Sequence, residues 1–155
     1  MMYKILDFIL ENQKFYGLLS NYELVDEKIS KNQQNLIVSA TVISQLSRYK
    51  FLNEILKKIF SENFLHLDIN FTFDPELLQM RINVKPTVDK YFTFYGTFYC
   101  SNDLDILSHQ LHIEYDKSFQ VVQKIMDKKI KKCIIDQVNR DILCLKKYIE
   151  NKYYS

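Results

Sequence analysis

The C-terminal stretch of the chain, residues 117–153, places the strongest constraint on the fold. Between residues 119 and 149 it contains neither Gly nor Pro, and its apolar residues recur at intervals of three and four. That spacing gives an α-helix one apolar face. The members of this stripe are Val122, Ile125, Met126, Ile130, Cys133, Ile134, Val138, Ile142, Leu145 and Ile149. The sequence therefore predicts one long helix that buries this face against the rest of the chain.

The apolar stripe does not stay on one side of an ideal helix. At about 100° per residue, the part in residues 119–133 and the part in residues 134–149 are rotated by roughly 140° from each other. Either the helix kinks near Cys133, or its packing partner follows a stripe that moves around the helix. A strongly twisted sheet that curls around the helix would do the second.

Four alternating runs precede the predicted helix, at residues 64–73, 78–84, 91–100 and 106–115. Apolar and polar side chains alternate in each run, as expected for strands with one covered and one solvated face. Turns with Pro, Asn, Asp or Ser separate the first strand from the second and the third from the fourth. These runs predict an antiparallel meander.

The N-terminal part of the chain supplies smaller elements. The apolar pattern predicts a helix at residues 2–13 and strands at residues 15–25 and 36–43, with a polar, mobile hairpin loop at 26–35. A second helix is expected at residues 48–62, where apolar residues recur at a spacing of four. The sequence thus predicts a single α+β domain over residues 1–155, in which a curved meander sheet wraps around the long C-terminal helix.

Composition and motifs exclude several classes of function. A net charge of +2 gives no general argument for nucleic acid as a partner. Gly17 and Gly96 are the only glycines, so no glycine-rich phosphate loop can form. His66 and His112 belong to the first and last strands of the meander, which lie apart, so no metal site is expected. We expect no catalytic residues, no cofactor and no enzymatic activity.

Neither a signal peptide nor an apolar run long enough to cross a membrane is evident. We therefore expect a cytoplasmic protein, or one released without a Sec signal. The three cysteines, Cys100, Cys133 and Cys144, show no CxxC spacing. Cys133 and Cys144 would lie roughly 16 Å apart along one helix, too far for a disulfide. Free thiols are expected.

Three sets of side chains are candidates for binding. Those that would face a lipid between meander and helix are Met80, Phe92, Phe94, Phe98 and Met126. Those that would meet an anionic head group are Lys124, Lys128, Lys131 and Lys132. A tyrosine ladder on the polar face of one strand is a candidate partner surface, formed by Tyr91, Tyr95 and Tyr99. The lysines also suit a solvated helix face, and the tyrosines suit packing over the stems of Arg81 and Lys85. Gly96 within that strand predicts a bulge or a strong bend.

The alternating run 64–115 and the drifting helix 117–153 resemble the tubular lipid-binding (TULIP) modules, in which a curved antiparallel sheet wraps a long helix. Within that superfamily, length and composition resemble the small OrfX-type proteins of clostridial botulinum neurotoxin gene clusters. The resemblance implies a toxin accessory protein that associates with sister proteins encoded beside it and contacts lipid. Lipid-transfer TULIP proteins are commonly longer, so this chain has less groove to enclose a lipid.

The START-like helix-grip fold is the alternative, because it has similar length and also ends in a long helix. It implies a small-molecule carrier or sensor with an internal cavity, and His109 is the evident polar candidate on the apolar side of its strand. Such chains usually begin with a strand and use Gly-rich turns, which this sequence lacks. We expect a non-enzymatic module that binds lipid or protein partners. Alternation alone leaves open whether the interior is packed or hollow.

Overall fold

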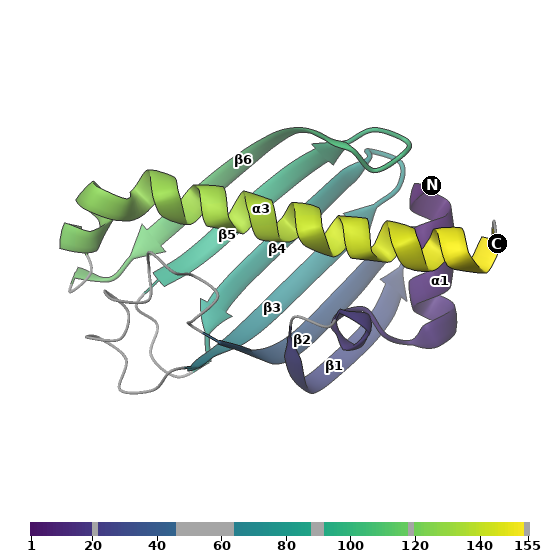
Figure 1. Ribbon diagram of the computed structural model, residues 1–155, viewed down its shortest axis with the longest axis horizontal. Coiled ribbons are helices and arrows are strands. Elements are labelled where there is room, and N and C mark those ends of the chain that lie inside the picture. Colours follow the sequence, from purple (N-terminus) through teal and green to yellow (C-terminus); the bar gives the residue numbers. More distant parts are fainter. Residues whose placement is uncertain (20–21, 46–63, 88–91, 118–119, 154–155) are drawn as a thin grey trace.

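The computed structural model describes residues 1–19, 22–45, 64–87, 92–117 and 120–153. Its helices and strands form an α+β domain (Figure 1). In chain order they are α1 (Met2–Asn12), the 3₁₀ turn η1 (Tyr16–Leu18), β1 (Glu23–Asn32), β2 (Asn35–Gln45), β3 (Phe64–Asp74), β4 (Gln79–Pro86), β5 (Phe92–Cys100), β6 (Ile106–Tyr115) and α3 (Gln120–Tyr153). The antiparallel runs and the long terminal helix predicted from the sequence are confirmed.

The six strands form one antiparallel sheet in the order β1-β2-β3-β4-β5-β6. The meander is therefore longer than the four strands that alternation predicted, because β2 pairs directly with β3 from Leu36 opposite Phe73 to Gln45 opposite Phe64. Alternation holds in the central strands β2 to β5: most side chains on one face are buried, and those on the other are mostly exposed or half-buried. One face of the sheet therefore forms the floor of the core.

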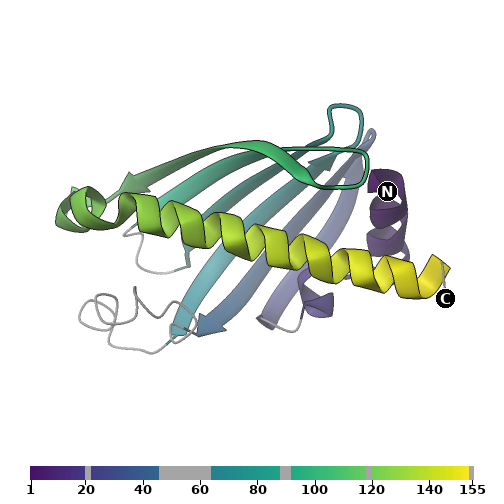
Figure 2. The same cartoon turned by 45° about the horizontal axis from the view of Figure 1, so that its top comes forward.

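Helix α3 crosses that buried face of the sheet (Figures 1 and 2). It continues through Cys133 as one helix of 34 residues. Among the side chains of α3 that the structure describes, the buried apolar ones are Val138, Ile142, Leu145 and Ile149. Ile130 and Ile134, in the N-terminal half, are only partly buried. The helix crosses the strands at an angle (Figure 1).

Helix α1 covers the sheet beside the C-terminal end of α3 (Figure 2). Its residues Ile5 and Ile9 are fully buried, and its Phe8 ring stacks on Tyr148 with ring centroids 6.2 Å apart. An ion pair joins Lys152 of α3 to Glu11 of α1. The two termini of the chain are therefore packed together over one end of the sheet.

Two N-terminal predictions were wrong. Residues 15–25 do not form one strand, because Phe15 and Tyr16 turn into the core and their backbone N–H groups both donate to Oε1 of Glu27, at 3.0 and 2.7 Å. The expected loop at 26–35 is instead most of β1, a two-residue turn and the start of β2. β1 is an exposed edge strand whose polar sequence lacks the alternation of a covered strand, so it was mistaken for a loop.

Of the bulge or strong bend expected at Gly96, the bulge was wrong. The register of β5 against β6 continues through Gly96 and shifts instead between Tyr99 and Cys100. Gly96 meets a packing need, because a Cβ atom there would lie 2.7 Å from Cδ2 of Leu111 and 3.0 Å from Cγ2 of Ile82. The helix predicted at residues 48–62 lies outside the described residues.

Candidate functional site

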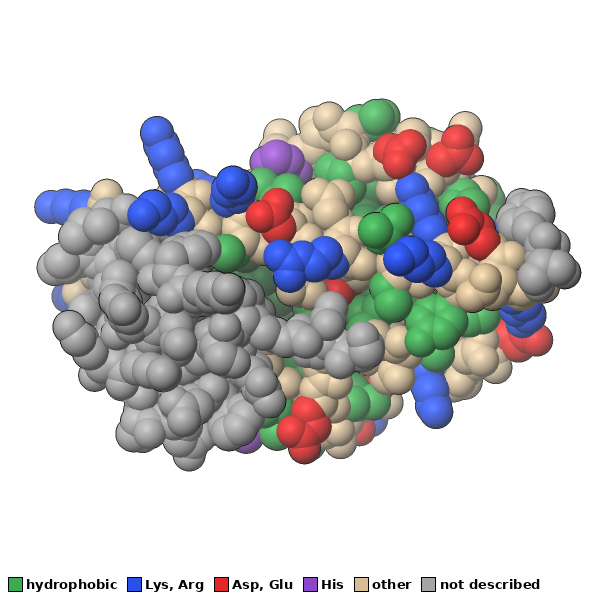
Figure 3. Space-filling model, in the orientation of Figure 1, with side chains coloured by type: hydrophobic (Ala, Val, Ile, Leu, Met, Phe, Trp, Pro, Cys, Tyr) green, Lys and Arg blue, Asp and Glu red, His purple; other side chains and the backbone are tan. Residues whose placement is uncertain are grey.

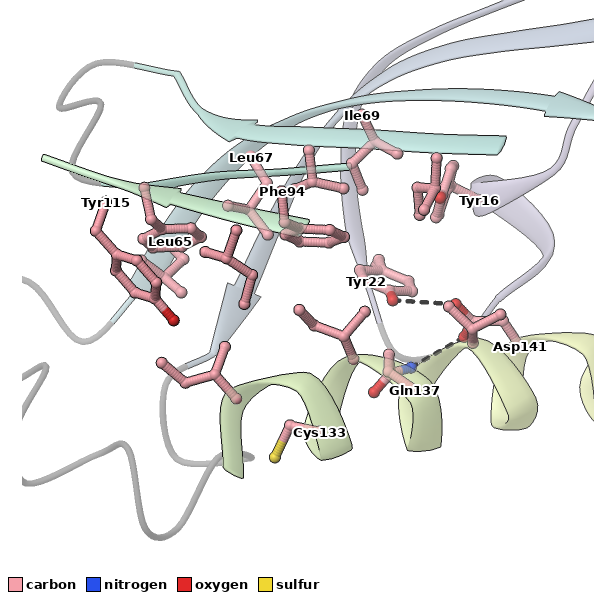
Figure 4. Close-up of a pocket in the computed structure, with 17 residues that line it drawn as sticks. Tyr16, Tyr22, Leu65, Leu67, Ile69, Phe94, Tyr115, Cys133, Gln137 and Asp141 are labelled. Carbon is pink, nitrogen blue, oxygen red and sulfur yellow. Dashed lines mark hydrogen bonds between the residues drawn. The ribbon is translucent and has the colours of Figure 1, made fainter. Parts of the chain in front are cut away.

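A cavity of about 110 Å³ lies between the middle of α3, at residues 130–141, and the buried face of the sheet (Figure 4). Its walls come from η1, the start of β1, strands β3 to β6 and α3, so remote parts of the sequence meet there. Eleven of the seventeen described residues that line it are aliphatic or Phe: Leu65, Leu67, Ile69, Ile82, Val84, Phe92, Phe94, Ile113, Ile130, Ile134 and Val138. The cavity is thus mainly apolar.

A cluster of polar side chains forms one end of the cavity. Asp141 of α3 is 8% exposed, although it lies within the apolar stripe of that helix. Its Oδ2 accepts a hydrogen bond from the Tyr22 hydroxyl at 3.1 Å, and its Oδ1 accepts one from Nε2 of Gln137 at 2.9 Å (Figure 4). The two donors help to stabilise a carboxylate that is largely removed from solvent.

Tyr16 lies at the same end, above Tyr22 and Asp141 in Figure 4. Its ring is 2% exposed and meets the Tyr22 ring edge-on, with centroids 5.3 Å apart. Burial raises the pKa of the Tyr16 hydroxyl well above its usual range, and the negative charges of Asp141 and Glu27 act in the same direction. The hydroxyl therefore keeps its proton at neutral pH.

Tyr115 marks the other end of the cavity (Figure 4). Its hydroxyl donates to Oδ1 of Asp127 at 2.9 Å, and Asp127 also pairs with Lys131 at 3.0 Å. Burial raises the pKa of Tyr115, and the hydrogen bond to Asp127 and its charge add to this effect. The Tyr115–Asp127 hydrogen bond ties β6 to the first half of α3, and Lys131 pairs with Asp127 within that helix.

The structure divides the lipid-facing candidates between cavity and core. Phe92 and Phe94 line the cavity. Met80 and Phe98 do not; they face each other across β4 and β5 and are completely buried in packed core. The side chain of Met126 lies outside the described part of the structure. The cavity therefore occupies only one part of the helix–sheet interface that the sequence analysis treated as a whole.

The head-group candidates lie on the first half of α3, and none lines the cavity. Lys124, Lys128 and Lys132 are exposed, whereas Lys131 is half-buried and paired with Asp127. Figure 3 shows basic side chains along the outer side of α3. Contact of these lysines with an anionic surface would therefore be separate from binding in the cavity.

The partner-surface candidates lie on the opposite face of the sheet. Tyr95 is 41% exposed and stands in register between Asn83 and His112, whereas Tyr99 is half-buried. Tyr91 is outside the described residues. Tyr95 borders a shallow groove of about 620 Å³, lined mainly by polar side chains. We refer to this feature as the outer groove.

The histidines contribute nothing to the cavity walls. His109 faces the same side as Phe98 but is exposed, and its ring centroid lies 6.2 Å from that of Phe98. His66 and His112 belong to β3 and β6, with two strands between them, as expected. Among the described residues, no group of three His, Cys, Asp or Glu side chains is arranged to hold a metal ion.

Sequence reasoning missed the polar end of the cavity. Asp141 lies far along the chain from Tyr16 and Tyr22 and meets them only through the fold. A signal was present at Asp141, which falls between Val138 and Leu145 on the predicted apolar face. A carboxylate at such a position needs polar partners from another element.

Within the described residues, no helix is both long enough and apolar enough to span a bilayer. Comparison of the chain with protein families, characterised proteins and solved structures finds no match in any of the three. The cavity and its chemistry are therefore the basis for assigning a function.

Proposed function

We propose that this protein binds a small hydrophobic molecule in the cavity between α3 and the sheet. The observation that carries the proposal is an apolar cavity of about 110 Å³ within a helix–sheet interface that is otherwise closely packed. Native interiors contain few voids larger than a water molecule, since each void forfeits packing contacts. A void of this size that is retained is a candidate ligand site.

The size and lining of the cavity suit a compact apolar group. An apolar cavity of about 150 Å³ engineered in another protein stays dry and binds benzene. Of the lining side chains, those from β3 to β6 are mostly aliphatic or Phe, so a ring or short alkyl chain would supply contacts that these side chains lack. The volume is too small for a whole lipid and fits at most part of an acyl chain.

The lining chemistry favours binding over catalysis. None of the histidines lines the cavity, and burial raises the pKa of Cys133, the cysteine that does. A reactive cysteine generally needs a lowered pKa. We therefore propose a carrier or sensor. The classification of this protein as TULIP-like or START-like is an expectation from the sequence. The long helix that lies against an antiparallel sheet is consistent with either fold.

The test is binding of toluene as an apolar probe, followed by two-dimensional amide NMR of the purified protein. We expect saturable shifts in the amides of residues around the cavity. Ile134→Phe, which places a larger ring in the cavity wall, should abolish these shifts. Leu143→Phe is the matched control, because Leu143 lies on the same helix and is 54% exposed. It should bind toluene like the wild type.

Absence of toluene binding by the folded wild type would refute the proposal. Equal loss of binding in Ile134→Phe and Leu143→Phe would show that the site is elsewhere or that the helix has shifted. Native mass spectrometry of freshly purified protein then tests for a natural ligand, as a bound mass that leaves on collisional activation.

A second candidate function is association with a protein partner through the outer groove. The observation that favours it is Tyr95, a large aromatic side chain exposed beside a polar concave surface. The products of neighbouring genes are the first partners to test, as the resemblance to accessory proteins implies. Co-purification that depends on Tyr95 would support this role.

A further inference from the structure

The sheet is open, and its two edge strands, β1 and β6, differ in charge (Figure 1). Half of the ten residues of β1 carry a formal charge: Glu23, Asp26, Glu27, Lys28 and Lys31. Of the ten residues of β6, only Glu114 does. Charged side chains on an edge strand oppose pairing with another chain, because pairing would remove them from water. β1 is therefore guarded against such pairing, and β6 is not.

The local structure of the two edges gives the same contrast. The register of β1 against β2 shifts near the start of β1, whereas β6 continues in register with β5 over residues 108–115. Within the part of the chain that the structure describes, β5 is the one strand that pairs with β6. Most side chains of β6 are exposed. Its outer edge is therefore open to a further strand.

The most favourable partner for this edge can be found by pairing β6 with a second copy of itself. Residues directly opposite each other in an antiparallel pair lie on the same face of the sheet, so a two-fold axis passes through one residue of each copy. The longest overlaps have the axis at Gln110, which pairs residues 106–114, or at Leu111, which pairs residues 107–115. Only these two registers use almost the whole strand.

The side chains distinguish the two registers. The axis at Leu111 places Glu114 opposite Ser108, whose hydroxyl can donate a hydrogen bond to the carboxylate. The axis at Gln110 places Glu114 opposite Ile106, which offers no such bond. Neither register sets like charges opposite each other, because Glu114 is the single formally charged residue of the strand. β6 is thus complementary to a second copy of itself, and the Leu111 register is favoured.

We propose that two copies of this chain associate through β6, as antiparallel strands related by a two-fold axis at Leu111. The sheets of both copies then form one continuous sheet, and both of its outer edges are β1. Because the charges of β1 oppose pairing, the assembly closes as a dimer and does not grow into a fibre. This interface is separate from the cavity, so the inference does not depend on the ligand proposed above.

The experiment is sedimentation equilibrium of the purified full chain over a range of concentrations, which measures the dissociation constant. We expect the wild type to reach twice the mass of one chain and not to exceed it. Ser108→Glu sets a glutamate opposite Glu114 on both sides of the axis, so it should raise the dissociation constant by about twofold to thirtyfold. Ser108→Lys creates an opposite-charge pair at the same place and should lower it.

Ser30→Glu is the matched control, because Ser30 is an exposed serine of the other edge strand. The same change there should leave the dissociation constant unchanged. Amide NMR spectra check that each variant is folded, and the wild-type mass already tests the proposal if one is not.

Three outcomes would overturn the proposal. The first is a wild type that stays monomeric up to millimolar concentration, and the second is a dimer that folded Ser108→Glu does not weaken. The third is growth beyond the dimer, because β1 would then pair as well. Weakening by both Ser108→Glu and Ser108→Lys would overturn the register at Leu111, since Glu114 would not lie opposite residue 108.

Discussion

The two halves of the α3–sheet interface have the same kind of sequence and different packing. At the C-terminal half, which we call the packed end, Leu145 and Ile149 are 1% and 0% exposed. Helix α1 contributes Ile5 and Ile9 to the same core. Around the cavity, at residues 130–141 of α3, which we call the hollow end, Ile130 and Ile134 are only partly buried.

The comparison suggests a division of roles along one helix. The packed end joins both termini of the chain and holds α3 on the sheet through close apolar contact. The hollow end gives up some of that contact and retains space beside a buried carboxylate. Stability should therefore depend mainly on the packed end, and ligand binding on the hollow end.

The largest expected effect comes from truncating one apolar side chain at each end. Leu145→Ala removes a fully buried side chain and should lower the free energy of unfolding by about 2–5 kcal/mol. Ile134→Ala removes a side chain that already borders a void. The enlarged cavity should therefore add only about 1 kcal/mol or less to the free energy of unfolding that is lost with the buried surface of this side chain. Urea denaturation of both variants measures the difference.

Both variants need the same check on cooperativity. Their m-values should equal that of the wild type, because a changed m-value would mean that the compactness of a state has changed. If Ile134→Ala costs as much as Leu145→Ala, the two ends are equally packed and the division of roles is wrong.

The sequence predicted the elements better than it predicted this difference. Alternation identified β3 to β6, and the three-and-four spacing identified α3, because burial on one face imposes those periods on the chain. β1 was missed since an edge strand exposed on both sides imposes no such period. Met80 lies in the packed core and Phe94 lines the cavity, but both occupy apolar positions in the same alternating pattern. The pattern therefore could not locate the cavity.

The polar end of the cavity was beyond sequence reasoning for another reason. Asp141 is supported by Gln137 on its own helix and by Tyr22 from the other end of the chain. The first contact follows from a helical spacing of four, but the second depends on how α3 crosses the sheet. Long-range pairings of this kind require a structure.

A smaller effect on stability should come from the buried thiol of Cys100 at the packed end, and it should depend on pH. Burial raises the pKa of Cys100 from 9.0 to about 11, although the charge of Lys146 acts in the opposite direction. The folded protein thus holds this proton more tightly than the unfolded chain does. The stabilisation is fully present below about pH 9 and is lost as the pH rises toward about 11.

The measurement is the free energy of unfolding of the wild type and of Cys100→Ala between pH 8 and pH 11. Over that range, we expect the wild type to lose about 1–2 kcal/mol more than the variant. Cys144→Ala is the control for loss of a thiol, since Cys144 is half-buried on α3. A pH dependence identical in wild type and Cys100→Ala would show that Cys100 is not held protonated by the packed end.

The smallest effect is expected on the opposite face of the sheet, at Tyr95. Phe94 points to the hollow end and Tyr95 to the outer groove, so two successive residues of β5 sample opposite surfaces. Tyr95→Ala should change the free energy of unfolding by less than about 1 kcal/mol, as exposed substitutions usually do.

The same substitution should leave toluene binding intact and weaken association with a co-expressed neighbouring gene product. A loss of stability as large as that of Phe94→Ala would mean that Tyr95 supports the sheet through cross-strand packing, and the outer groove would lose its main argument as a partner surface.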